Sequence, residues 1–212
     1  MRKAKILRIT GPEAVEEVVR VLREGGMVAI PTDTVYGLAV LPTHPKALRR
    51  LLAFKGAQSG PMVALLLADL EALPRFAELP EATRPLAERF WPGPLTMLLP
   101  RTDTVPAGIG EGRGVGIRIP DSPLARDLIR AAGGALAVTR ANRPGRPVGR
   151  NAQEVLAELD GEVDLIVEGG PAPAGIASTV VDCTRWPPIV LREGAILEVE
   201  ILKTVGLTRP RP

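Results

Sequence analysis

The sequence predicts a single α/β domain built on a twisted, mixed β-sheet with helices packed on it. Short apolar segments typical of buried strands alternate with amphipathic segments of helical period, and strands dominate the C-terminal part. The chain has 212 residues, of which 45% are hydrophobic, enough for one sizeable core. Only 3% are aromatic, so we expect this core to consist mainly of Leu, Val, Ile and Ala.

In the first half of the chain, proline and glycine mark where the predicted helices begin and end. Pro12 and Gly25 bound the first helix, and His44 and Pro45 begin the second. We therefore expect His44 to be a surface residue at a helix start and not a catalytic group. The predicted strands are residues 4–10, 27–31, 62–68 and 95–100. The predicted helical segments are residues 12–26, 44–56, 70–73 and 80–90.

In the second half, two helices have side chains suited to capping their first turn. Ser122, followed by Pro123, is expected to cap a helix over residues 122–134, and Asn151 one over 151–161. The predicted strands are residues 115–120, 135–140, 163–170, 178–184, 188–194 and 197–202. The domain is expected to span residues 1–205, and residues 206–212 to form a loose C-terminal tail.

The composition excludes several kinds of chemistry. One cysteine, Cys183, excludes a disulfide within the chain, and we expect it to be a core thiol. With a single histidine there is no Cys/His zinc site, and only His44 could serve a Ser-His-Asp triad. No apolar stretch is long enough to span a membrane and no signal peptide is recognisable, so a soluble, cytoplasmic protein is expected.

The net charge is +3 and the isoelectric point about 9.4. This mild basic excess suits anionic ligands such as nucleotides or RNA, although a solvated charged surface accounts for it equally well.

Polar and glycine-rich loops follow several predicted strands, which is where α/β proteins build ligand sites. The first is "PTDTVYG", residues 31–37, where Thr32, Asp33 and Thr34 end an apolar strand. The segment could instead start a helix capped by Asp33 or Thr34, with Tyr36 packed inside; for Asp33 we prefer a capping role to a metal-side one.

Two cations in other segments have two interpretations each. Lys55 either completes the last turn of a helix capped by Gly56, or reaches a phosphate or carboxylate. Arg118 alternates with Ile117 and Ile119 in a predicted strand, so its side chain points to the opposite face. If other elements cover that face of the sheet, Arg118 is buried and needs an anion as a partner. If the face is exposed to solvent, Arg118 is a surface arginine with no special role.

A loop rich in arginine follows the strand at 135–140. It contains Arg140, Arg143, Arg146 and Arg150 together with Asn142, which is typical either of an anion cradle or of a basic surface loop. Ser178 and Arg192 lie in two C-terminal segments that are not diagnostic alone.

Read together, these segments resemble the YrdC-like family, the threonylcarbamoyl-AMP synthases. The similarity runs from about residue 16 to 196. The matching motifs, in order, are "PTDTVYGLA", "WPGPLTMLL", "VGIRIPD", "RAN-x-x-G", "STVVD" and "LREG". The resemblance implies a YrdC/RibB-like fold with a concave, basic site.

The resemblance also implies a nucleotidyltransferase reaction. In this family, L-threonine, bicarbonate and ATP give threonylcarbamoyl-AMP and pyrophosphate, with Mg²⁺ expected on the phosphates. Partner proteins then use the product to modify an adenosine of certain tRNAs. Such a reaction has to hold two anions together and exclude water, which Lys, Arg and loop hydroxyls can do without His or Cys.

The resemblance assigns roles to ten residues. Lys55 and Arg118 are expected to be catalytic, offsetting charge at the phosphate or carbamate and at the threonine carboxylate. The residues expected at threonine are Thr32, Thr34, Tyr36, Arg118, Arg140 and Ser178. Those expected at the nucleotide are Lys55, Asn142, Arg150 and Arg192. No protein side chain is assigned to a metal.

The chain departs from the family pattern at two of these motifs. The family has Lys-x-Arg where this chain has Ala57 after Lys55 and Gly56, and it has Ser-x-Asn where this chain has Arg140 before Asn142. One hypothesis is that Arg140 supplies the guanidinium missing at Ala57. The alternative is a diverged paralogue that binds nucleotides or double-stranded RNA without the synthase activity. Carbamoyl transfer of the kind seen in a related hydrogenase-maturation protein is a third possibility, disfavoured because that protein's other domains are missing here.

Overall fold

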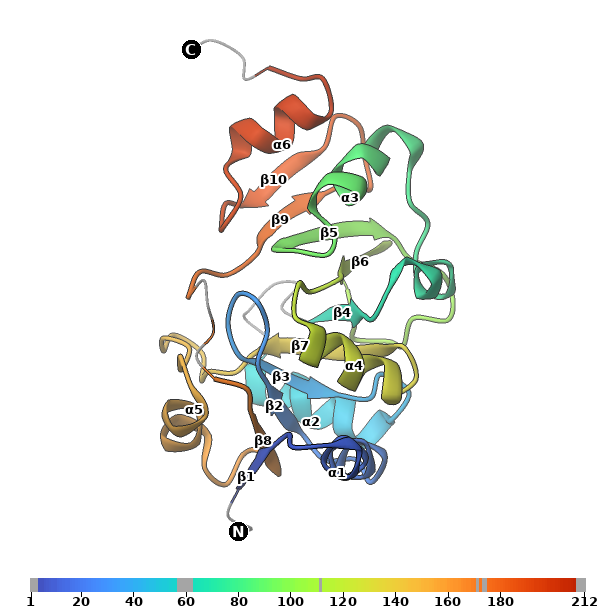
Figure 1. The fold of residues 1–212 in the computed structure, drawn as a ribbon. Helices are drawn as coiled ribbons and strands as arrows, with labels where there is room; N and C mark the ends of the chain where they lie inside the picture. The colour runs from blue at the N-terminus through green and yellow to red at the C-terminus, as the bar shows by residue number, and fades with distance from the viewer. Residues whose placement is uncertain (1–3, 57–62, 111, 171, 173–174, 209–212) are drawn as a thin grey trace.

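The computed structural model describes residues 4–56, 63–110, 112–170, 172 and 175–208. Within these residues the strands form one ten-stranded sheet in the order β1-β8-β2-β3-β7-β4-β6-β5-β9-β10. Four of the strand pairs are parallel and five are antiparallel, so the mixed sheet predicted from the sequence is confirmed. Figure 1 shows it as a strongly twisted sheet that runs the length of the molecule.

The strands are short, as the brief apolar runs in the sequence predict. Their bounds are β1 Lys5–Arg8, β2 Val28–Ile30, β3 Gly37–Val40, β4 Ala64–Leu67, β5 Leu95–Pro100, β6 Gly114–Arg118, β7 Ala135–Arg140, β8 Leu165–Glu168, β9 Thr179–Asp182 and β10 Ile189–Arg192.

Helices cover both faces of the sheet (Figure 1). The α-helices are α1 Pro12–Arg23, α2 Pro45–Lys55, α3 Arg84–Phe90, α4 Pro123–Ala131, α5 Ala152–Leu159 and α6 Glu198–Thr204, and Leu70–Arg75 and Glu81–Thr83 are 3₁₀ turns. Apolar side chains of α1 and α4 pack on one face with the β2 and β8 side chains. Those of α2, α3, α5 and α6 pack on the other face in a second, larger cluster.

The predicted caps lie where the sequence placed them. His44 begins α2, with its Nδ1 accepting from the Ala47 N–H at 3.3 Å. Ser122 caps α4 through the Ala125 N–H at 3.3 Å, and Asn151 caps α5 through the Glu154 N–H at 2.9 Å. These bonds satisfy donors that a helix start otherwise leaves unpaired.

Two local predictions are wrong. Residues 37–40, treated as part of a loop or a helix start, form the strand β3, which pairs with both β2 and β7. Asp33 therefore caps no helix. Residues 197–202, predicted as a strand, begin the helix α6, because the chain leaves the sheet after β10 and packs Ile201 against the core.

The last residues follow α6 closely as far as they are described. The Leu207 N–H donates to the Leu202 carbonyl at 2.8 Å, and residues 209–212 of the predicted tail lie outside the described residues. No helix of the described part is both long and apolar enough to cross a bilayer.

The helical state of α6 can be tested with two positions. In a strand, Val199 and Ile201 would share a face, whereas in the helix Ile201 is fully buried and Val199 is 43% exposed. We expect Ile201→Ala to lower the free energy of unfolding by about 2–5 kcal/mol and Val199→Ala by less than about 0.5 kcal/mol. Urea denaturation of the two variants checks this, and equal losses would contradict the helix.

Candidate functional site

A cavity of about 310 Å³ lies against one face of the sheet, beyond the part that α1 and α4 cover. Its walls come from segments far apart in the sequence. They are the β2–β3 loop, alternate residues of β4, β5 and β6, the last three residues of β7, and the chain around β9 and β10. Alternate residues of a strand share a face, so neighbouring strands present their side chains to the same space.

Seven of the ten expected residues line this cavity: Thr32, Thr34, Tyr36, Arg118, Arg140, Ser178 and Arg192. They lie as far apart as residues 32 and 192 in the chain. The sheet brings them together because the strands that carry or flank them lie in its consecutive part from β3 to β10.

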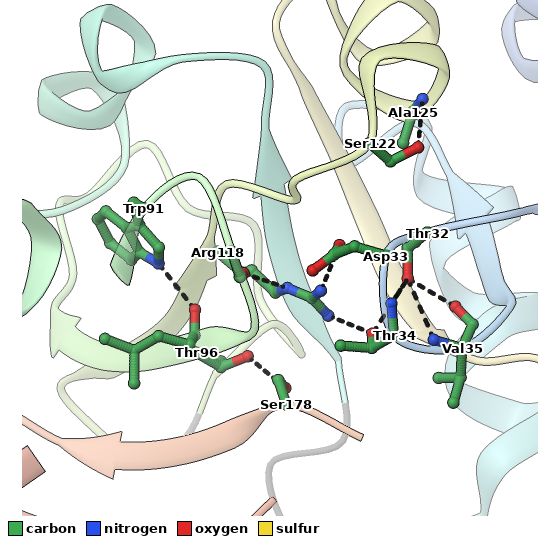
Figure 2. Close-up of polar contacts among 12 residues, drawn as sticks. Thr32, Asp33, Thr34, Val35, Trp91, Thr96, Arg118, Ser122, Ala125 and Ser178 are labelled. Atoms are coloured by element: carbon green, nitrogen blue, oxygen red, sulfur yellow. Dashed lines mark hydrogen bonds and ion pairs between the residues drawn. The ribbon is translucent and has the colours of Figure 1, made fainter. Parts of the chain in front are cut away.

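Arg118 is the most enclosed of these cations, with only 6% of its surface exposed. Its Nη2 donates to the Asp33 carboxylate at 2.5 Å, its Nη1 to the Thr34 hydroxyl at 2.8 Å, and its Nε to the Gly93 carbonyl at 3.0 Å (Figure 2). Burial lowers the pKa of the guanidinium, and the adjacent Asp33 acts in the opposite direction. Of the two interpretations of Arg118, the buried one is therefore confirmed, and its anion is Asp33.

The β2–β3 loop is held by its own hydroxyls. Thr32 Oγ1 donates to the Val35 carbonyl at 2.7 Å and lies 3.1 Å from Thr34 Oγ1 (Figure 2). Tyr36 is fully buried, and its hydroxyl donates to the Gly170 carbonyl at 2.9 Å. Burial raises the pKa of Tyr36, so the phenol stays protonated near neutral pH. The loop is thus a built surface that presents hydroxyls and backbone groups to the cavity.

Lys55 and Asn142 contact each other and do not line the cavity. The Lys55 Nζ donates to the main-chain oxygen of Asn142 at 2.6 Å and to its side-chain oxygen at 2.8 Å. Burial, with a smaller effect from the Arg140 charge, lowers the pKa of Lys55 to about 8. At the end of α2, a fraction of the Lys55 side chains is therefore neutral in mildly alkaline solution.

Arg140 lines the cavity, and its charge also lowers the pKa of Arg192, after the larger effect of burial. The hypothesis that Arg140 supplies the guanidinium missing at Ala57 needs Arg140 at the site, and Arg140 does line the cavity. Ala57, the other half of that hypothesis, lies outside the described residues. Arg150 is not brought to the cavity: its side chain is 78% exposed and lies 3.7 Å from Glu154.

Several residues at the site were not among those expected from the sequence. Asp33 is the anion of Arg118, and Thr96, Gly116 and Thr139 line the cavity. Thr96 Oγ1 lies 2.8 Å from Ser178 Oγ (Figure 2), a pair of hydroxyls on neighbouring strands. A threonine among apolar residues in the strand 95–100 was the available signal for Thr96. Thr139 Oγ1 is buried and has no hydrogen-bond partner in the described part of the chain.

Two further side chains have structural roles, and Cys183 is the core thiol that the sequence predicts. Burial raises the pKa of the Cys183 thiol to about 12, so this core cysteine is unreactive near neutral pH. Trp91 is buried, with its Nε1 donating to the Leu95 carbonyl at 2.7 Å. The described residues contain no cluster of three or more His, Cys, Asp or Glu side chains able to hold a metal ion.

The comparisons with known proteins agree with this architecture. The family model Sua5_yciO_yrdC, described as "Telomere recombination", matches residues 20–194. A threonylcarbamoyl-AMP synthase of Pyrococcus abyssi is 38% identical over 193 residues, which is 90% of this chain but 57% of that protein. The chain thus spans little more than half the length of that relative.

Two solved structures have the same fold. P. abyssi Sua5 in complex with L-threonine superposes with a TM-score of 0.88 at 35% identity, covering 97% of this chain and 62% of that one. Escherichia coli YciO superposes with a TM-score of 0.81 at 28% identity, covering 92% of this chain and 97% of that one. The latter match shows that the fold described here also occurs as nearly a whole protein.

The Arg118–Asp33 pair should behave as a buried ion pair. Removing one partner leaves an uncompensated buried charge, so we expect Asp33→Ala to lower the free energy of unfolding by about 3–5 kcal/mol. The double variant Asp33→Leu/Arg118→Met should lose much less free energy of unfolding than the two single variants lose together. Glu81→Ala is the matched control, because its partner Arg84 lies at 2.8 Å on the surface, and it should cost less than about 1 kcal/mol. Additive losses in denaturant titrations would contradict this coupling.

The lowered pKa of Lys55 predicts the sign of a pH effect. Between pH 8 and the ordinary lysine value of 10.5, the unfolded chain binds a proton at Lys55 that the folded chain does not. The free energy of unfolding should therefore rise with pH relative to Lys55→Met, by at most about 1.4 kcal/mol per pH unit. Parallel stability curves for the two proteins from pH 7 to 10 would show that Lys55 titrates normally.

Proposed function

Because the chain belongs to the Sua5/YciO/YrdC family, we propose that it is a threonylcarbamoyl-AMP synthase that converts ATP, L-threonine and bicarbonate to threonylcarbamoyl-AMP and pyrophosphate. The observation that carries the proposal is the single cavity in which hydroxyls of the β2–β3 loop meet the guanidinium groups of Arg118, Arg140 and Arg192. Such a lining suits a zwitterionic amino acid beside a phosphate.

Arg118 is the group best suited to the threonine carboxylate. A guanidinium has five N–H donors, and three of them are used within the described part of the chain. The other two remain for a ligand carboxylate. Because Asp33, Thr34 and Gly93 fix the plane of the guanidinium, little side-chain entropy is lost when the ligand binds.

The hydroxyls supply the remaining contacts of the amino acid. Thr32, Thr34 and Ser178 line the cavity, and Ser178 shares one hydrogen bond with Thr96. In such a pair one hydroxyl donates and the other keeps its proton, which is available to a ligand oxygen.

In the proposed reaction, the amine of threonine forms a bond to the carbon of bicarbonate, and water is lost. An oxygen of the resulting carbamate attacks the α-phosphorus of ATP, and the bond to the β-phosphate breaks to release pyrophosphate. No side chain has to act as a covalent nucleophile. The residues act by holding two anions together and by offsetting the charge that develops between them.

Mg²⁺ would reach this site on the phosphates of ATP. The described side chains do not by themselves fit a divalent cation, since the carboxylate beside the cavity, Asp33, is held by Arg118. The protein partners that would use the product on tRNA, and a cytoplasmic location for that pathway, follow from the proposed activity alone.

The size of the cavity suits an enzyme that acts on small molecules better than a module that binds double-stranded RNA. The three arginines face a space of about 310 Å³. A duplex is instead contacted along its phosphates over an extended surface. RNA binding without synthase activity is therefore the outcome that the following test separates from our proposal.

Pyrophosphate release from ATP should require both L-threonine and bicarbonate, and omitting either should reduce the rate at least tenfold. The rate should change little between 50 and 200 mM salt, whereas RNA binding through several phosphates should fall steeply over that range. Release without threonine, or no release together with salt-sensitive RNA binding, would contradict the proposal. A large gain in rate for Ala57→Arg/Arg140→Ser would indicate a degenerate paralogue.

A further inference from the structure

The four cations near the cavity differ in whether they already have a partner. Arg118 is paired with Asp33 at 2.5 Å, and Lys55 donates to both oxygens of Asn142. Arg118 is therefore electrically offset inside the protein, and Lys55 is engaged by Asn142 and is not part of the cavity lining.

Arg140 and Arg192 line the cavity, and neither makes an ion pair within the described residues. Arg192 Nη2 donates to the Ser178 carbonyl at 2.9 Å, a neutral partner. No hydrogen bond from the Arg140 guanidinium is recorded in the described part of the chain. The positive charges of Arg140 and Arg118 both act on Arg192, so the guanidinium groups lie within electrostatic reach of one another.

The sheet explains why these two arginines face the same space. Arg140 ends β7 opposite Gly37 of β3, and Gly37 has no side chain to cover it. A Cβ at Gly37 would lie 2.6 Å from Val138 Cγ1, so the position is sterically restricted. Arg192 ends β10, opposite Val180 of β9, on the far wall of the cavity.

Two guanidinium groups that face the same cavity repel each other, and the described residues place no carboxylate in an ion pair with either of them. Leu66, Leu98 and Val180 make up part of the cavity wall. Arginine stays protonated under all ordinary conditions, so the repulsion is not relieved by loss of a proton. An anion with several oxygens and more than one negative charge can accept hydrogen bonds from both guanidinium groups and offset both charges. A single carboxylate offsets the charge of only one of them.

We propose that Arg140 and Arg192 together bind the oligophosphate part of the substrate, a group of the pyrophosphate class, and that Arg118 is left for a carboxylate. This rests on the proposed function for the identity of the whole substrate, but the phosphate site itself does not require that any reaction occurs. This proposal assigns Arg140 to the phosphates, whereas the family resemblance led us to expect it at threonine. Arg140 thus provides a positive charge at the place where the family pattern has an uncharged serine.

The test uses inorganic pyrophosphate as the probe, with binding measured by calorimetry on the full chain at constant ionic strength. Arg140→Ser should weaken binding by about tenfold or more, since a lost charged hydrogen bond costs about a factor of ten. The affinity of Arg140→Lys for pyrophosphate should lie between those of Arg140→Ser and the unchanged protein. Lysine keeps the positive charge but loses the paired N–H donors of the guanidinium. Arg143→Ser is the matched control on the same loop: it removes an equal charge, but Arg143 pairs with Glu162 and lies outside the cavity lining. It should change the affinity by less than twofold.

L-Threonine binding to the same variants separates the two halves of the site. Arg140→Ser should leave the threonine affinity within twofold of the unchanged protein. A loss of threonine binding with pyrophosphate binding intact would overturn the assignment, as would equal effects of Arg140→Ser and Arg143→Ser or no pyrophosphate binding at all. A protein that binds pyrophosphate through Arg140 but releases none from ATP would support this inference while refuting the proposed synthase. Thermal melting of Arg140→Ser and Arg140→Lys confirms that both variants are folded.

Discussion

The ion pair between Arg118 and Asp33 is the contact on which the site depends. It joins strand β6, in the middle of the sheet, to the loop that connects β2 and β3. Both side chains are largely buried, at 7% and 13% exposure, so neither charge can be satisfied by water if the other is lost. The pair therefore fixes the position of Thr32 and Thr34 relative to the sheet and, at the same time, the orientation of a guanidinium that faces the cavity. A single contact supports both the loop structure and the binding surface.

The elements that local chemistry determines were predictable from the sequence. Proline, serine and asparagine at helix starts placed α2, α4 and α5, because those residues satisfy backbone groups within their own turn. The region that failed is one where local preference is weak. Residues 198–204 contain Val and Ile, which favour strands, yet they form a helix because the chain there packs Ile201 on the core instead of pairing at the sheet edge. Strand β3 was missed because it directly follows the polar loop and begins with Gly37, a residue type that strands rarely contain.

The sequence predicted which residues lie at the candidate site better than it predicted which of their side chains contact each other. Motif order was enough to bring Thr34, Arg118 and Ser178 to one cavity, since the sequence resemblance implied a common fold. It could not show that Asp33 would neutralise Arg118, or that Lys55 would be engaged by Asn142. Such pairings are set by side chains that meet across strands far apart in sequence, and spacing along the chain carries no information about them. For the same reason, Arg150 was grouped with the site although it lies on the surface.

The position of Arg192 at the end of β10 has a consequence for how the protein is made. One wall of the cavity comes from the chain around β9 and β10, of which β9 pairs with β5 and β10 pairs with β9. During synthesis on the ribosome, domains emerge from the N-terminus, so the loop at Thr32 is available long before its opposite wall. A nascent chain thus has no complete cavity until β10 has left the exit tunnel, and a chain cut short before that point lacks the cavity wall that carries Arg192.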